Sequence, residues 1–214
     1  MSHAVSLFDH SGAMLQPWAD AGYTCWAVDI DHPVDGAEQD GINLVRHDLS
    51  TPWLPPFDRA DIRFVAAFPP CTHLAVSGAR WFRGKGLRAL ASSIELFATA
   101  AEFCEWASNA KTMIENPVST ISTYWRPPDH HFHPWQYAAL QPDENYTKKT
   151  CLWTGGGFVM PTPETLDPPG LFGGDIPDNR IWEMGPSEMR SRFRSLTPSG
   201  FAQAVFEANH RESG

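Results

Sequence analysis

The residues best suited to covalent chemistry lie where a short apolar run stops at two prolines. The run from Ile62 to Phe68 combines β-branched and aromatic side chains and predicts a short buried strand. Pro69 and Pro70 end this strand, because proline has no N–H and a fixed φ. Cys71 is thereby held at the mouth of a sheet, where a tethered nucleophile loses little entropy on reacting. Taken alone, the stretch also fits a cysteine that packs as a small hydrophobic residue.

Reactive or hydrogen-bonding side chains recur at the ends of five consecutive predicted strands. They are His10 and Ser11 after the first strand, Asp29 and Asp31 after the second, Asp48 after the third, Cys71 after the fourth and Glu115 at the end of the fifth. In a parallel sheet these ends share one edge, which is where such sheets bind their ligands. This common edge favours Cys71 as a nucleophile over a merely packed cysteine.

Apolar runs alternate with segments of helical periodicity along most of the chain. Strands are expected at the start of HAVSLFDHSGAM and in YTCWAVDIDH, INLVRHDLS, DIRFVAAFPP, KTMIENP and KKTCLWTG, and helices from Leu15 to Gly22, over 86–111 and from Pro198 to Asn209. This alternation predicts an α/β fold with a mostly parallel sheet flanked by helices. The segment from Pro161 to about residue 186 is rich in proline and glycine and predicts irregular loop.

The longest predicted helix presents one apolar face. Its members recur at steps of three and four residues and are Leu87, Leu90, Ile94, Phe97, Ala101 and Cys104. We therefore expect Cys104 to pack in the core.

Composition bounds the possible function classes. The chain has 214 residues, of which 42% are hydrophobic, and this predicts a single α/β domain over 1–214. It shows no stretch long enough for a membrane helix and no signal peptide pattern. Its four cysteines lie far apart without a CxxC pair, which favours a reducing, cytoplasmic location over a zinc ribbon or a disulfide framework. A net charge of −9 argues against non-specific binding of nucleic acid, although a local basic patch remains compatible with it.

Taken in order, these residues resemble the C5-cytosine DNA methyltransferase family, which uses S-adenosylmethionine (SAM). The family's Pro-Pro-Cys stands here as Pro69-Pro70-Cys71, and its Glu-Asn dipeptide as Glu115-Asn116. The stretch LFDHSGAM is similar to the family's glycine-rich opening, although His10 and Ala13 replace expected glycines. The resemblance covers roughly residues 5–160. Its later part, WQYAALQPDENYTKKTCLW, looks like short, phage-encoded members of the family.

The resemblance implies a Rossmann-like SAM-dependent methyltransferase fold with the cofactor at the first strand ends. It implies that Asp29 accepts the ribose hydroxyls and that Asp48 takes the adenine amino group, although both acids also fit a turn-forming role. The implied cofactor contacts are Phe8, Asp9, His10, Ser11, Gly12, Asp29, Ile30, Asp48 and Pro69.

The resemblance also implies a covalent mechanism. Cys71 would add to C6 of a cytosine, and Glu115 would contact N3 while charge develops on the ring. Asn116 would orient the loop or the base, or simply form a turn before proline. Lys149 stands where the family has the second arginine of Gln-x-Arg-x-Arg, so it would contact O2 of the base or a phosphate. Thr147 and Asn145 replace the other two residues of that motif.

Two further clusters, one of histidines and one of arginines, each have a functional and a non-functional interpretation. His130, His131 and His133 could bind zinc, but a solvated or substrate-covering loop fits their tight spacing better, so no metal is expected. Arg190, Arg192 and Arg194 alternate, so an extended segment would turn all three to one side as a phosphate-binding row. A plain surface run is the other interpretation.

Family members that act on DNA carry a sizeable recognition domain, where this chain has only the loop-rich segment 160–190. The sequence therefore leaves three hypotheses open: a minimal DNA cytosine methyltransferase, the same chemistry on a free cytosine nucleotide such as dCMP, or a SAM-binding module without catalysis. A second copy or a partner subunit could supply target recognition.

Overall fold

The computed structural model describes residues 2–34, 36–166, 176–184 and 193–210. Its centre is an eight-stranded sheet with the order β3-β4-β2-β1-β5-β6-β8-β7. The strands are β1 (His3–Leu7), β2 (Thr24–Asp29), β3 (Ala37–Gln39), β4 (Ile42–Arg46), β5 (Ile62–Ala67), β6 (Lys111–Pro117), β7 (His130–Phe132) and β8 (Thr150–Gly155). The helices are α1 (Gln16–Asp20), α2 (Phe82–Trp106), α3 (Ile121–Tyr124), α4 (Arg180–Glu183) and α6 (Ser199–Asn209).

Five neighbouring strands, β4, β2, β1, β5 and β6, run parallel to one another. In chain order, and with β3 set aside as an added edge strand, they read 3-2-1-4-5, which is the Rossmann order. β8 pairs antiparallel with β6, and β7 pairs antiparallel with β8. The predicted α/β fold with a mostly parallel, Rossmann-like sheet is therefore confirmed. The strand order reverses around β1, and ligands of such sheets bind outside the carboxyl ends at that point.

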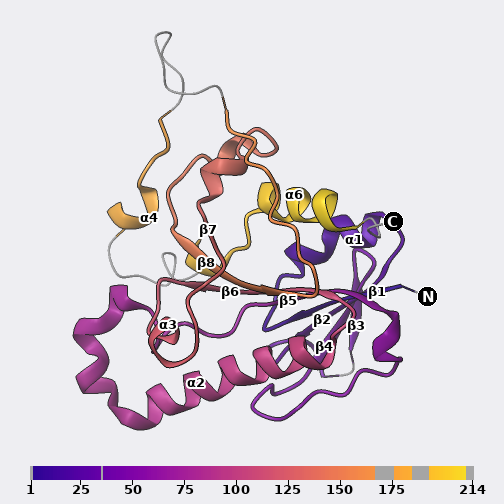
Figure 1. Cartoon of the computed structure of the whole chain (residues 1–214), viewed down its shortest axis with the longest axis horizontal. Coiled ribbons are helices and arrows are strands. Elements are labelled where there is room, and N and C mark those ends of the chain that lie inside the picture. The colour runs from indigo at the N-terminus through magenta and orange to yellow at the C-terminus, as the bar shows by residue number, and fades with distance from the viewer. Residues whose placement is uncertain (1, 35, 167–175, 185–192, 211–214) are drawn as a thin grey trace.

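Helices cover both faces of the sheet. Because side chains alternate along each strand, the central strands bury residues on both faces. On β1, Val5 and Leu7 pack on the face that α2 covers with Phe97 and Phe103. Ala4 points to the opposite face, where α1 and α6 lie. Figure 1 shows α2 along one side of the sheet and α1 and α6 along the other. This burial on two faces explains why the central strands read as nearly continuous apolar runs.

Two strands, one short helix and part of a helix face depart from the sequence-based expectation. The helix α4 lies within the segment that was expected to be irregular loop, and it has only four residues. β3 and β7 were not expected; each has three residues and lies at an edge of the sheet, so its sequence carries no apolar run. Leu87 does not belong to the buried face of α2, because its side chain is 83% exposed. Gly86, with φ 81° and ψ 167°, breaks the helix just before it, so the regular stripe begins only at Leu90. Cys104 packs against the α2-side core, as expected.

No helix in the described residues is long and apolar enough to cross a membrane.

The stability of the core on the α1 side depends on one large buried ring, that of Trp18. Trp18 is fully buried and stacks on Phe64 with ring centroids 4.4 Å apart. We expect Trp18→Ala to lower the free energy of unfolding by about 3–5 kcal/mol, because it removes this contact and leaves a cavity. The matched change Trp81→Ala removes an exposed ring and is expected to stay within about 0.5 kcal/mol of the parent. Urea denaturation followed by circular dichroism measures both, and equal losses would contradict this packing.

Candidate functional site

The sheet brings the expected residues to one edge. Asp29 is the last residue of β2, Glu115 and Asn116 lie near the end of β6, and Cys71 follows β5 by four residues. β5 and β6 are adjacent and parallel, with Ala67 paired to Ile114, so the turn after β5 and the end of β6 lie side by side. The predicted convergence of Cys71 and Glu115 therefore has a direct cause in the strand order.

A buried hydrogen bond ties these two strand ends together. Asn116 Nδ2 donates to the carbonyl oxygen of Pro69 at 2.9 Å. The chain then turns back, because the carbonyl of Cys71 accepts from the N–H groups of Leu74 and Ala75 at 3.0 and 2.9 Å. Cys71 is thus held between a side-chain bond to Pro69 and a tight turn of its own backbone, which is the stiff tether that the sequence predicted.

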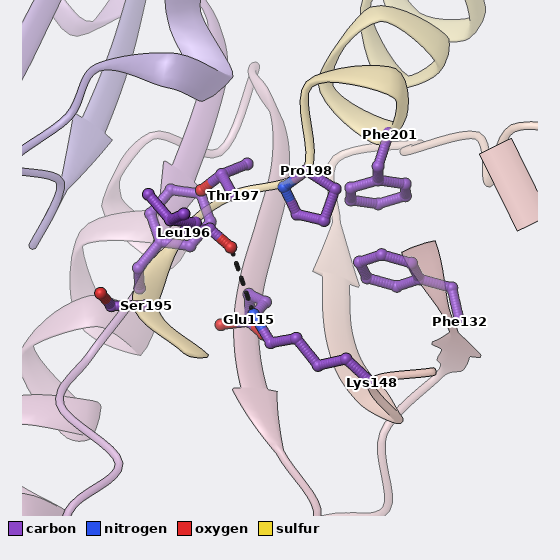
Figure 2. Close-up of a pocket in the computed structure, with 9 residues that line it drawn as sticks. Glu115, Phe132, Lys148, Ser195, Leu196, Thr197, Pro198 and Phe201 are labelled. Atoms are coloured by element: carbon purple, nitrogen blue, oxygen red, sulfur yellow. Dashed lines mark hydrogen bonds and ion pairs between the residues drawn. The ribbon is translucent and has the colours of Figure 1, made fainter. Parts of the chain in front are cut away.

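Glu115 lies among groups of opposite charge. Burial raises the pKa of its carboxyl, while the nearby cations of Lys148 and Arg194 act to lower it. Lys148 Nζ lies 4.0 Å from Glu115 Oε1, and both side chains are mostly buried. Lys148 Nζ also donates to the carbonyl oxygen of Leu196 at 3.3 Å, as Figure 2 shows. Glu115 is therefore a buried acid whose protonated form is favoured by desolvation.

Cys71 shares this electrostatic environment. Burial and the charge of Glu115 raise the pKa of its thiol, and Arg194 and Lys148 oppose that rise. Arg194 Nη2 also donates to Ser77 Oγ at 3.2 Å, which links the segment before α6 to the segment that follows Cys71. Arg190 and Arg192, the other members of the predicted arginine row, lie outside the described residues.

The lysine beside Glu115 is Lys148. Lys149, to which the sequence resemblance gave a contact with O2 of the base or a phosphate, is its neighbour in the chain and has an exposed side chain. Consecutive residues entering a strand point to opposite sides, so a shift of one position exchanges the two side chains. Lys149 is exposed and lies near His131 and His133, whose pKa values are lowered by burial and then by its charge. Thr147 donates to Asn179 Oδ1 at 2.6 Å. Among the described residues no group of histidine, cysteine and acid side chains could hold a metal ion.

The turn after β1 is closed by Asp9. Its Oδ1 accepts from Ser11 N, Ser11 Oγ and Gly12 N at 3.1, 2.9 and 2.8 Å. Phe8 and Gly12 have φ of 57° and 67°, values that side-chain-bearing residues rarely adopt, and a Cβ at Gly12 would come within 3.1 Å of Ile42. Burial raises the pKa of Asp9. Asp9 therefore shapes the turn from inside, and exposed His10 and Ser11 form its outer surface.

The ends of β2 and β4 present their acids to solvent through similar turns. Asp29 Oδ1 accepts from Asp31 N, and Asp48 Oδ1 accepts from Ser50 N, both at 2.9 Å. The bond from Ser50 N lowers the pKa of Asp48. Ile30, beside Asp29, leaves half of its surface exposed. These acids thus form turns, as the alternative interpretation expected, and each keeps a second carboxylate oxygen at the edge of the sheet.

His32 was missed by the sequence reasoning. It is buried, and its two ring nitrogens lie 3.2 Å from the carbonyl oxygens of Val45 and His10. It therefore joins the ends of β1, β2 and β4 into one wall. A single histidine in a polar loop gives no sequence pattern that would reveal this role.

A small pocket opens beside Glu115 and is closed by the segment before α6. Figure 2 shows Glu115 and Lys148 facing Leu196, Thr197 and Pro198, with Phe132 and Phe201 stacked at one end. The two phenylalanine rings lie 3.8 Å apart between centroids. The pocket therefore combines an acid, a cation and apolar walls, and its cavity of about 10 Å³ has room for about one water molecule.

No family model and no curated protein matches the chain. Among solved structures, one described as that of a DNA modification methyltransferase encoded within an E. coli prophage is 15% identical, with a TM-score of 0.41. The match covers 87% of this chain and 56% of the other, so the chain spans just over half of that protein's length. A likeness this distant does not identify a function.

The two lysines give a direct test of the electrostatics around Cys71. Lys148→Met removes a cation that stabilises the thiolate, so we expect the pKa of Cys71 to rise and its alkylation by iodoacetamide to slow severalfold at about pH 8. The matched change Lys149→Met is expected to leave the rate unchanged. Peptide mass spectrometry across a pH series measures both. Slower alkylation in Lys149→Met, with Lys148→Met unaffected, would exchange the roles of the two lysines.

Proposed function

We propose that this chain is a SAM-dependent methyltransferase that methylates C5 of cytosine in DNA, with Cys71 as the nucleophile. The observation that carries the proposal is the convergence of Cys71 and Glu115 on adjacent parallel strand ends, fixed by the Asn116–Pro69 bond. A thiol next to a buried acid matches what this chemistry requires. C5 of a pyrimidine is a poor nucleophile until a thiolate adds at C6 and a proton donor disperses the charge at N3.

The residues at the ends of β1 and β2 fit SAM by their chemistry. The strained turn from Phe8 to Gly12 brings backbone close to the point where the strand order reverses, as the charged methionine end of SAM requires. Asp29 keeps one carboxylate oxygen that is not used by Asp31, and it would accept the ribose hydroxyls. Half-exposed Ile30 would pack on the adenine ring. When bound, SAM supplies the activated methyl group that C5 takes up.

The chain's own residues perform the remaining steps. The thiol of Cys71 loses its proton to solvent, and Sγ bonds to C6 as the electron pair of the C5–C6 double bond moves into the ring. Glu115 gives a proton to N3 in the same step. After methyl transfer the proton on C5 leaves to water, the C6–S bond breaks, Cys71 departs as a thiolate and N3 returns its proton to Glu115. The raised pKa of Glu115 supports this role, because burial favours the protonated form that can donate to N3, while the charges of Lys148 and Arg194 act in the opposite direction.

Lys148 and Arg194 supply the positive charge that the thiolate needs. Both oppose the rise in the pKa of Cys71 that burial causes. In this proposal Lys148, which lines the pocket, takes the contact with O2 of the base, one of the two alternatives that the sequence resemblance gave to Lys149. Asn116 is a positioning residue, since its amide holds Pro69.

A covalent trap tests the nucleophile. With SAM and a DNA substrate containing 5-fluorocytosine, we expect a stable protein–DNA adduct, because fluorine cannot leave as a proton does. Cys71→Ser is expected to abolish the adduct. Cys104→Ser and Cys151→Ser are matched controls that should retain it, since burial raises the pKa values of these thiols to about 12 and about 11. Denaturing gels show the adduct, and one that survives Cys71→Ser would exclude Cys71 as the nucleophile.

Calorimetry tests the cofactor site separately. We expect SAM or its demethylated product to bind, and Asp29→Ala to weaken binding by about tenfold, because one good hydrogen-bonding pair to a charged group is lost. Asp58→Ala is the matched control. Asp58 also closes a turn, accepting from Ala60 N at 2.8 Å, but it precedes β5 and so lies at the opposite end of the strands. No binding at millimolar ligand would overturn the proposal.

A further inference from the structure

The segment that follows Cys71 is basic in an otherwise acidic chain. No aspartate or glutamate occurs from Cys71 to Ile94, whereas the whole chain carries a net charge of −9. Four exposed cations lie there: Arg80, Arg83, Lys85 and Arg88. None of them forms an ion pair with a carboxylate within the part of the chain that the structure describes. This charge is therefore available to an anionic partner.

Exposed aromatic rings accompany these cations. Trp81 is 60% exposed, Tyr124 60% and Trp125 43%. The guanidinium of Arg80 lies over the ring of Trp81 at 5.1 Å, and that of Arg126 lies over Trp125 at 4.6 Å. Rings held in place by guanidinium groups offer flat stacking faces to solvent. Trp125 also contacts the core residue Phe97 edge-on, with ring centroids 5.8 Å apart.

The two segments that carry these side chains lie side by side and next to Cys71. Val76 N donates to Val118 O, and Thr120 N donates to Leu74 O, both at 3.0 Å. Lys85 Nζ donates to the carbonyl of Thr72, the neighbour of Cys71, at 2.7 Å. In Figure 1 the start of α2 and α3 flank the same end of the molecule. Residues 76–88 and 121–126 thus form what we call the basic–aromatic surface.

We infer that the basic–aromatic surface binds a single strand of DNA and leads one of its bases to Cys71; this rests on the proposed function. The phosphates of a strand carry the charge that the four exposed cations would attract, and its unpaired bases could stack on the exposed rings. A free nucleotide has one phosphate site and one base and would leave most of this surface unused. A duplex keeps its bases stacked inside, so it would not use the rings.

The inference is tested by binding without SAM, using a fluorescent single-stranded oligonucleotide of about 16 nucleotides that contains cytosine. We expect binding to weaken with salt by a log–log slope of about 0.7 per phosphate neutralised. The double change Arg83→Ala with Lys85→Ala should reduce that slope by about 1.4. Trp81→Ala should weaken binding by about tenfold, and Trp81→Phe should retain most of it. Arg59→Ala, a change of an exposed cation at the opposite end of β5, should have no effect.

The outcomes separate this inference from the proposed function. Equal or tighter binding of a duplex, or of dCMP with a slope near one, would overturn the inference, and the 5-fluorocytosine trap on those substrates would still report on Cys71. Strand binding that is insensitive to Arg83, Lys85 and Trp81 would overturn it as well. Strand binding through this surface, with neither SAM binding nor an adduct, would support the strand-binding surface, while the proposed function and the delivery of a base to Cys71 would both fail.

Discussion

The hydrogen bond from Asn116 to the carbonyl of Pro69 is the constraint on which the site depends. Two consecutive prolines remove two backbone N–H groups from the turn after β5, so that turn cannot be fixed by ladder bonds of its own. The donor comes instead from the side chain of the residue that follows Glu115 on the neighbouring strand. The positions of Cys71 and Glu115 are therefore coupled: a shift of β6 relative to β5 moves both the acid and the anchor of the cysteine.

The parts of the fold that the sequence predicted are those whose burial leaves a strong pattern. β1, β5 and β6 are buried on both faces, so their apolar runs identify them, and the order of strands and helices then gives a parallel sheet. β3 and β7 were not predicted because a strand of three residues is too short to show a recognisable pattern of apolar residues. The exposure of Leu87 results from Gly86, whose positive φ interrupts the helix. The spacing of apolar residues in the sequence does not show that φ.

The same distinction applies to the site. That Cys71 and Glu115 converge follows from topology, because parallel strands end at one edge, and the sequence was enough to predict it. Which of the two adjacent lysines faces Glu115 depends on which way each side chain points as the chain enters β8. The sequence TKKT does not show this, because a shift of one residue would exchange the two lysines. The bond between Arg194 and Ser77 joins positions far apart in the chain, and His32 acts through two backbone carbonyls. Such contacts are set by tertiary packing, and local sequence does not encode them visibly.

Charge ties the site to the surface beside it. Burial raises the pKa values of the Cys71 thiol and of the Glu115 carboxyl, so it favours the neutral form of both groups. Lys148 and Arg194 lower the cost of the thiolate only in part, and Arg194 reaches the site from a segment that also bonds to Ser77, at the edge of the basic–aromatic surface. In the proposed mechanism, a strand that settles on that surface brings its base to Glu115, and protonation at N3 offsets the negative charge that the thiolate delivers to the ring. The thiol therefore becomes reactive when the acid has a ring to protonate, which confines its chemistry to the bound substrate.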